Sequence, residues 1–119
     1  MKWYLAKVVY RILCGDGKHT AQFDEQLRLV SAADEAEAFE KAAAIGRSEA
    51  EAFFNNRQEV VQWQFVNVSE LYPLQQLMDG AELYSRITEV DDAEAYMDFV
   101  HHKAENIQQQ RTLELLNVI

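Results

Sequence analysis

The sequence predicts an α+β fold, a two-layer sandwich in which a four-stranded antiparallel sheet carries two helices on one face, in the order ββαββα. Three observations support this fold. Residues 22–30 alternate between apolar and polar side chains, which is the two-residue period of a half-buried strand. After Ser31 the apolar residues recur at helical spacing, so a strand passes into a helix through a very short joint. The same succession returns after Asp79-Gly80, in residues 81–107.

Residues 3–14 form the first predicted strand, because they are rich in Val, Ile, Leu and Tyr and no helical stripe fits them better. Gly15 and Gly17 follow within three residues, which is a strong turn signal, and the strand therefore opens an antiparallel hairpin. One side of this strand is wholly apolar and is assigned to the core. The other side is mixed: Trp3, Leu5, Lys7, Val9, Arg11 and Leu13.

The second predicted strand covers residues 22–30 and has one clearly apolar side. Phe23, Leu27 and Leu29 alternate with polar residues, so the pattern assigns these three to the core. The polar side is assigned to solvent or to an open sheet face: Asp24, Gln26 and Arg28.

The first predicted helix runs from Asp34 to about Phe54. Asp34 and Glu37 have the spacing of a capping box, in which both side chains satisfy unpaired backbone donors at the helix start. Gly46 falls inside the helical pattern, either as a break or as a position where the helix approaches the sheet closely. Glu49 lies within the apolar stripe, and a salt bridge or a place at the helix edge is the favoured explanation.

The second half is predicted to repeat this plan. Residues 60–68 form a third strand with Trp63 and Phe65 inward, and residues 81–89 form a fourth with Leu83 and Ile87 inward. Asp91 or Asp92 then caps a second helix. The whole chain, 1–119, is predicted to be a single domain, with a core at 1–110 and a C-terminal tail at 111–119.

Composition excludes several classes of function. The net charge is -9, which repels phosphate backbones and anionic lipids, and no Lys/Arg cluster offsets it, so neither nucleic acid nor a membrane is an expected partner. The chain has one cysteine, so no intramolecular disulfide forms. Lys7 and Arg11 interrupt the apolar N-terminus, and no small-residue cleavage site follows, so a cytoplasmic location is expected.

No residue is assigned a catalytic role, and no cofactor or metal is expected. Cys14 lies on the apolar side of its strand, where a thiol is hard to ionise. His19 is interpreted as a solvated turn residue. His101 and His102 are adjacent on a helix, so they point in different directions and do not clasp one ion. His102 is interpreted as a half-buried rim residue.

The sheet face away from the helices is the more informative feature, because a solvated face rarely carries a tryptophan with three aliphatic residues on one strand. Either a second chain or the C-terminal tail is expected to cover it, and a second chain is preferred. The predicted interaction face consists of Trp3, Leu5, Lys7, Val9, Arg11, Arg28, Tyr84 and Arg86.

Five segments of the chain resemble an uncharacterised bacterial family, domain of unknown function 4288. They are WYLAKVVYRI, QFDEQLRLV, EAFEKAAAIG, VQWQFVNVSEL and DGAELYSRI, and the likeness extends from Trp3 to about Ile87. The resemblance implies a bacterial protein with no assigned activity, cofactor or site residue.

The leading hypothesis is therefore a small, non-enzymatic protein-interaction module that acts as a homodimer, with a further protein partner as an option. One alternative is a small-molecule-binding or enzymatic domain with a pocket between helices and sheet. Another is an acidic, immunity-type antagonist that covers a basic partner.

Overall fold

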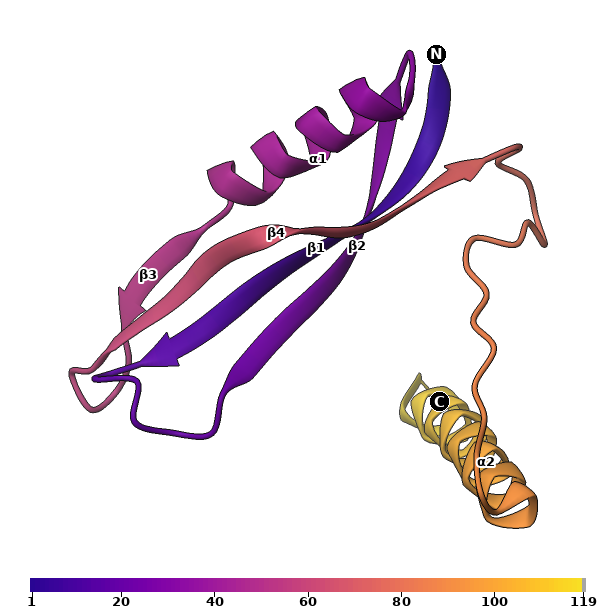
Figure 1. The fold of residues 1–119 in the computed structure, drawn as a ribbon. Helices are drawn as coiled ribbons and strands as arrows, with labels where there is room; N and C mark the ends of the chain where they lie inside the picture. Colours follow the sequence, from indigo (N-terminus) through magenta and orange to yellow (C-terminus); the bar gives the residue numbers. More distant parts are fainter. Residues whose placement is uncertain (119) are drawn as a thin grey trace. The chain divides into compact units, whose positions relative to one another are not determined.

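The computed structural model describes the backbone of residues 1–118 and the side chains of residues 1–111. The chain divides into two units, Met1–Ser85 and Arg86–Ile119. The first unit holds the whole sheet and one helix, and the second holds the other helix (Figure 1).

Four strands make up the sheet: β1 (Lys2–Cys14), β2 (Gln22–Ala32), β3 (Glu51–Phe54) and β4 (Val60–Leu74). Their spatial order is β2-β1-β4-β3, and every neighbouring pair is antiparallel. The sheet is curled, and α1 (Glu35–Ser48) lies along one of its faces (Figure 1). The predicted α+β class with four antiparallel strands is thereby confirmed.

The hydrophobic core lies between α1 and the long central strand β1. Alternate residues of β1 are almost wholly buried: Tyr4, Ala6, Val8 and Tyr10, at 0–2% exposure. The helix faces them with small side chains, Ala38, Ala42, Ala43 and Gly46. Small residues on the helix let the two backbones approach closely, so the bulky partners come from the sheet.

Gly46 is a position where α1 approaches the sheet closely, which is one of the two explanations that the sequence offers for this glycine. A Cβ atom built on it would lie 2.6 Å from Phe65 Cδ1 and 2.9 Å from Val8 Cγ1. The Tyr10 hydroxyl donates a hydrogen bond of 2.8 Å to the Gly46 carbonyl. The glycine thus serves packing and does not break the helix.

The predicted start of α1 is confirmed, and its predicted end is wrong. Asp34 Oδ1 accepts from the Glu37 N–H at 2.9 Å, and Glu37 Oε2 accepts from the Ala33 N–H at 3.0 Å. The helix ends at Ser48 and not near residue 54. Ser48 Oγ and the N–H of Glu49 both donate to the Ile45 carbonyl, which closes the last turn.

The segment assigned to the end of the helix is instead strand β3, joined to β4 by a tight turn. The Asn55 side chain organises this turn, because its Oδ1 accepts from the N–H groups of Arg57 at 2.9 Å and Glu59 at 3.0 Å. Gln58 adopts a positive φ of 62°. The polar run after β3 is therefore a hairpin turn and not a helix terminus.

The predicted orientation of β2 is also wrong. Tyr4 is opposite Val30 and Ala6 is opposite Arg28, and directly opposite residues share a sheet face. The polar residues Asp24, Gln26 and Arg28 therefore lie on the α1 face, and Phe23, Leu27 and Leu29 on the other. The cause lies at the joint to α1, where Val30 and Ala32 are 1% and 0% exposed beneath the helix and fix the alternation of the whole strand.

β4 is longer than the predicted third strand, and the predicted strand at residues 81–89 does not form. β4 pairs with β1 from Cys14↔Val61 to Trp3↔Leu74, with two register shifts on the way. Both edges of β1 are therefore taken, and no place beside it remains for a further strand. The element order still has two strands between the helices, but they come from different segments than predicted.

In the second unit, Asp92 caps α2 (Ala93–Val118), since its Oδ1 accepts from the Ala95 N–H at 3.1 Å. Of the two predicted caps, Asp91 and Asp92, the structure confirms Asp92. Residues 111–118, expected to be a C-terminal tail, continue the helix, while Ile119 lies outside the described residues. The side chain of His102 is 76% exposed, and its Nδ1 lies 3.7 Å from Glu105 Oε2. The expected half-buried rim position is therefore wrong.

Candidate interaction surface

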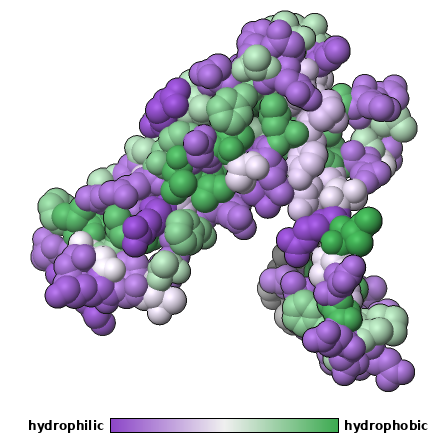
Figure 2. Space-filling view, in the orientation of Figure 1, coloured by the Kyte–Doolittle hydropathy of each residue, from purple (hydrophilic) through white to green (hydrophobic). Residues whose placement is uncertain are grey.

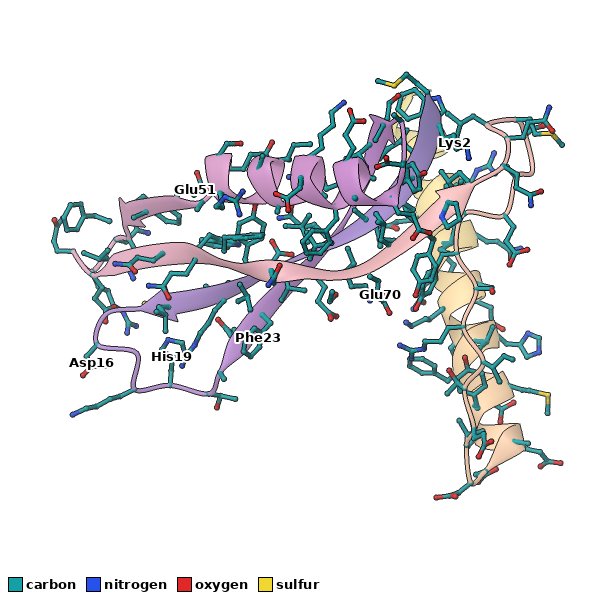
Figure 3. The ribbon with its side chains drawn as sticks, turned by 45° about the horizontal axis from the view of Figure 1, so that its top comes forward. Lys2, Asp16, His19, Phe23, Glu51 and Glu70 are labelled. Atoms are coloured by element: carbon teal, nitrogen blue, oxygen red, sulfur yellow. The ribbon has the colours of Figure 1, made fainter. Side chains whose placement is uncertain are left out.

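The open face is our name for the sheet surface that points away from α1. Figure 3 shows two of its members, Phe23 and Glu70, on the opposite side of the sheet from the helix. The strand registers give its other members by alternation. The open face consists of Trp3, Leu5, Lys7, Val9, Arg11 and Leu13 of β1, Phe23, Glu25, Leu27 and Leu29 of β2, and Gln62, Gln64, Asn67, Glu70, Tyr72 and Leu74 of β4.

The half of the open face over β1 and β4 carries an ion pair, Lys7–Glu70, with two tyrosines beside it. Lys7 Nζ lies 2.9 Å from Glu70 Oε2 and 5.8 Å from the centre of the Tyr84 ring. Tyr84 in turn meets Tyr72 edge to face, with ring centres 5.7 Å apart. Leu5, opposite Tyr72 in the register, is 6% exposed. The chain itself therefore covers part of this half through its segment 81–85.

Proton affinities in this cluster follow from the same contacts. The hydrogen bond from Lys7 to Glu70 raises the pKa of the lysine above its ordinary value, so Lys7 is a fixed cation at neutral pH. Burial, followed by the charge of Glu70, raises the pKa of Tyr72. A lysine whose charged form is stabilised in this way is a poorer nucleophile or base.

The half of the open face over β2, together with Trp3 on the adjacent strand β1, is different, because its four large apolar side chains are only half covered. Trp3 is 42% exposed, Phe23 56%, Leu27 50% and Leu29 47%. Figure 2 shows hydrophobic side chains at the surface of the sheet unit, set among hydrophilic ones. An apolar cluster with a polar surround is typical of a surface that contacts another protein.

Arg28, predicted for the open face, lies on the α1 face in a row of polar side chains along β2. Its guanidinium forms an ion pair with Glu49 at the end of α1, with Nη1 3.4 Å from Oε1, and its Nε donates to Gln26 at 3.1 Å. Gln26 donates to Asp24 Oδ2 at 2.7 Å, and the indole N–H of Trp63 donates to the same oxygen at 3.2 Å. The salt bridge favoured for Glu49 is confirmed. Both partners are partly exposed, so the pair contributes about 0–1 kcal/mol.

The structure thus brings together five of the eight residues predicted for the interaction face: Trp3, Leu5, Lys7, Val9 and Arg11. Tyr84 lies against the same face, although it comes from a segment with no strand. Arg86 belongs to the second unit.

Sequence reasoning missed the largest apolar contributors to the open face: Phe23, Leu27 and Leu29. Their alternation was visible in the sequence, but it was assigned to the core.

The turn after β1 holds His19, which the sequence predicts to be a solvated turn residue (Figure 3). Its Nδ1 bonds to the Thr20 carbonyl at 2.8 Å, and its Nε2 accepts from the Cys14 N–H at 3.0 Å. With Nε2 as the acceptor, Nδ1 is the ring nitrogen that donates. Both ring nitrogens are therefore used to hold the turn, although a polar hollow of about 500 Å³ lies beside it.

Among the residues that the structure describes, no group of three or more His, Cys, Asp and Glu side chains is placed to hold a metal ion. None of the helices described here is both long enough and apolar enough to cross a membrane. A second hollow of about 510 Å³ lies between the end of β4 and residues 75–85, lined by both Tyr72 and Tyr84.

Together, the fold and the surface define a small α+β domain with one sheet face sealed by a helix and the other partly bare. The chain belongs to the family described as Domain of unknown function (DUF4288), whose model matches residues 3–85. The match coincides with the sheet unit and ends where the second unit begins. No curated protein and no solved structure matches the chain.

Proposed function

We propose that this protein is a small, non-enzymatic interaction module that forms a homodimer, with the β2 half of the open face in the contact. The observation that carries the proposal is the exposure of four large apolar side chains, Trp3, Phe23, Leu27 and Leu29, on one side of the sheet. Covering such residues gains about 25 cal/mol for each Å² of apolar surface.

The contact belongs to β2 and not to the centre of the sheet. Tyr84 already lies over Lys7, so flat packing of two sheets across Leu5 would have to displace it. Lys7 and Arg28 already have ion-pair partners within the chain, Glu70 and Glu49. Attraction between two copies therefore depends on the apolar residues and on the charged side chains of β2.

A second copy is the simplest partner, because a two-fold axis lets one surface cover itself. The acidic charge of -9 agrees equally with a basic protein partner, but no feature of the open face selects one. A cytoplasmic location, a single domain over residues 1–119 and a second helix on the α1 face of the sheet stay predictions from the sequence.

The test compares Leu27→Glu with the control Phe39→Glu, since both parent residues are large, apolar and exposed, at 50% and 38%, but Phe39 belongs to α1 on the other side of the sheet. Light scattering of the full chain should show a dimer for the parent and for Phe39→Glu. For Leu27→Glu the dissociation constant should rise at least about tenfold, because a carboxylate would be buried in the contact. Circular dichroism should be the same for all three.

A parent protein that remains monomeric at high micromolar concentration would overturn the homodimer. Equal weakening by both variants would show that the contact lies elsewhere. Leu5, although it is on the same face, is a poor position for this test because it is 6% exposed and a buried charge there would destabilise the fold.

A further inference from the structure

The two edges of the sheet differ sharply in length. β3 has 4 residues, whereas β2 has 11, contains no proline and pairs only with β1. An unpaired edge strand offers every second backbone N–H and C=O group to another strand. Lys41 Nζ occupies the Ser31 carbonyl at one end, at 2.8 Å, which leaves residues 22–30 as the stretch for pairing.

We propose that two copies of this chain pair through their β2 edges, antiparallel, about a two-fold axis at Gln26, and so join two four-stranded sheets into one of eight strands. The proposal rests on the homodimer proposed above and places its contact at the β2 edge. There the partner's strand covers part of Phe23, Leu27 and Leu29, whereas Trp3 on β1 lies outside the new ladder. Paired edges also remove the hazard of an exposed, partly apolar edge strand.

Charge selects this register among those that a two-fold axis allows. With the axis at Gln26, Asp24 of each copy lies opposite Arg28 of the other on the α1 face, so that Arg28, which already forms an ion pair with Glu49 of its own chain, faces a second carboxylate. A residue on the axis meets its own copy, so an axis at Asp24, Glu25 or Arg28 would bring two like charges together. An axis at Leu27 leaves each Asp24 opposite Val30.

The apolar side chains agree with the same register. On the open face, Phe23 of each copy lies opposite Leu29 of the other. The Cβ atoms of directly opposite residues are about 4.5–5.5 Å apart, so the two side chains would be in contact. Leu27 lies opposite Glu25, where its neighbours across the new ladder cover part of its surface. The exposed side chains of the two β2 strands then form one continuous strip, and the two open faces become one surface.

The first experiment uses cysteine cross-linking in a Cys14→Ser background, so that the introduced thiol is the only one in the chain. Gln26→Cys should form an intermolecular disulfide under mild oxidation, because a residue on the axis meets its own copy at nearly the spacing of a disulfide. Glu25→Cys and Leu27→Cys are the matched controls. Each would meet its own copy only diagonally, at about 7–8 Å, and should cross-link at least tenfold more slowly.

The second experiment exchanges charges between copies and does not depend on a thiol. One variant carries Asp24→Lys; the other carries Arg28→Glu with Glu49→Gln, which removes repulsion within the chain. Alone, each variant places like charges across the axis and should be at least tenfold weaker as a dimer. Mixed in equal amounts, they place Lys opposite Glu and Arg opposite Asp, so a heterodimer should form. Lost contacts within one chain would not be restored by mixing.

Each outcome decides between the two proposals. Fastest cross-linking at Gln26 together with rescue on mixing supports edge pairing in this register. Fastest cross-linking at position 25 or 27 overturns the register. A parent dimer with slow cross-linking at all three positions and no rescue overturns edge pairing but leaves the homodimer through the open face. A monomeric parent overturns both proposals.

Discussion

The two faces of the sheet are built from the same central strand but end in opposite states. On the α1 face, Tyr4, Val8 and Tyr10 of β1 are at most 2% exposed. On the open face, β1 supplies Trp3 and Leu5, and β2 adds Phe23, Leu27 and Leu29, yet only Leu5 is buried. The side that looks most apolar along β2 is therefore the side that α1 does not cover.

This difference shows that apolar alternation marks a surface to be covered but does not say what covers it. The α1 face is closed within the chain, because a helix of small residues fits onto large sheet residues. The open face has no such element over β2 within the sheet unit. The predictions below test the contrast between a closed and an open face, and the largest expected effect comes first.

Tyr10→Ala should cost about 3–5 kcal/mol of the free energy of unfolding, because the ring is fully buried and its hydroxyl bonds to Gly46. Leu27→Ala, on the open face, should cost less than about 1 kcal/mol in dilute protein. Urea denaturation followed by circular dichroism gives both values. Similar losses for the two variants would mean that the faces are not distinct in the isolated chain.

Gly46→Ala should lower the free energy of unfolding by about 1–3 kcal/mol, because the new methyl group overlaps the Phe65 ring and Val8. The control is Ala44→Ser, an exposed position two residues earlier on α1, which should change stability by about 0.5 kcal/mol or less. A stabilised Gly46→Ala protein would show that helix propensity outweighs the close approach and that α1 sits farther from the sheet.

The smallest expected effect is a pH dependence on the open face. The folded-state pKa of Lys7 is raised above the ordinary 10.5, so its stabilising contribution is complete below that value and is lost as the pH rises through the folded-state pKa. The raised pKa of Tyr72 acts in the same direction, from its ordinary value of 10.0. The unfolding free energy should therefore fall with pH in the alkaline range.

Glu70→Gln should make this fall shallower, since Glu70 is the main cause of the Lys7 shift. Glu35→Gln, at the exposed first turn of α1, is the matched control and should leave the slope unchanged. Equal slopes for parent and Glu70→Gln between about pH 9 and 11 would contradict the ion pair.

Local signals in the sequence were sufficient for part of the fold. The first strand, its glycine turn and the cap at Asp34 depend on neighbouring residues alone, and each was predicted correctly. Gly46 and Glu49 were recognised as exceptions in a helical pattern, and both have specific partners in the structure.

The errors have non-local causes. The side of β2 that faces the core is decided by Val30 and Ala32 under α1, while the stronger alternation from Phe23 to Leu29 points the other way. Residues 81–89 alternate like a strand, but β2 and β4 already occupy both edges of β1, and this segment forms no ladder with the edge strands β2 and β3 either. Within the candidate surface, β1 was assigned correctly, and Arg28 was placed on the wrong face together with the rest of β2.

The two tryptophans of the chain fall on different faces, and this gives the protein two built-in optical probes. Trp3 stands on the open face at 42% exposure. Trp63 lies on the α1 face, with its ring stacked on Phe53 at 5.8 Å and its N–H bonded to Asp24. With Trp3→Phe, the remaining fluorescence follows unfolding; with Trp63→Phe, it follows whatever approaches the open face. Binding and folding can thus be separated in one protein without attaching a dye.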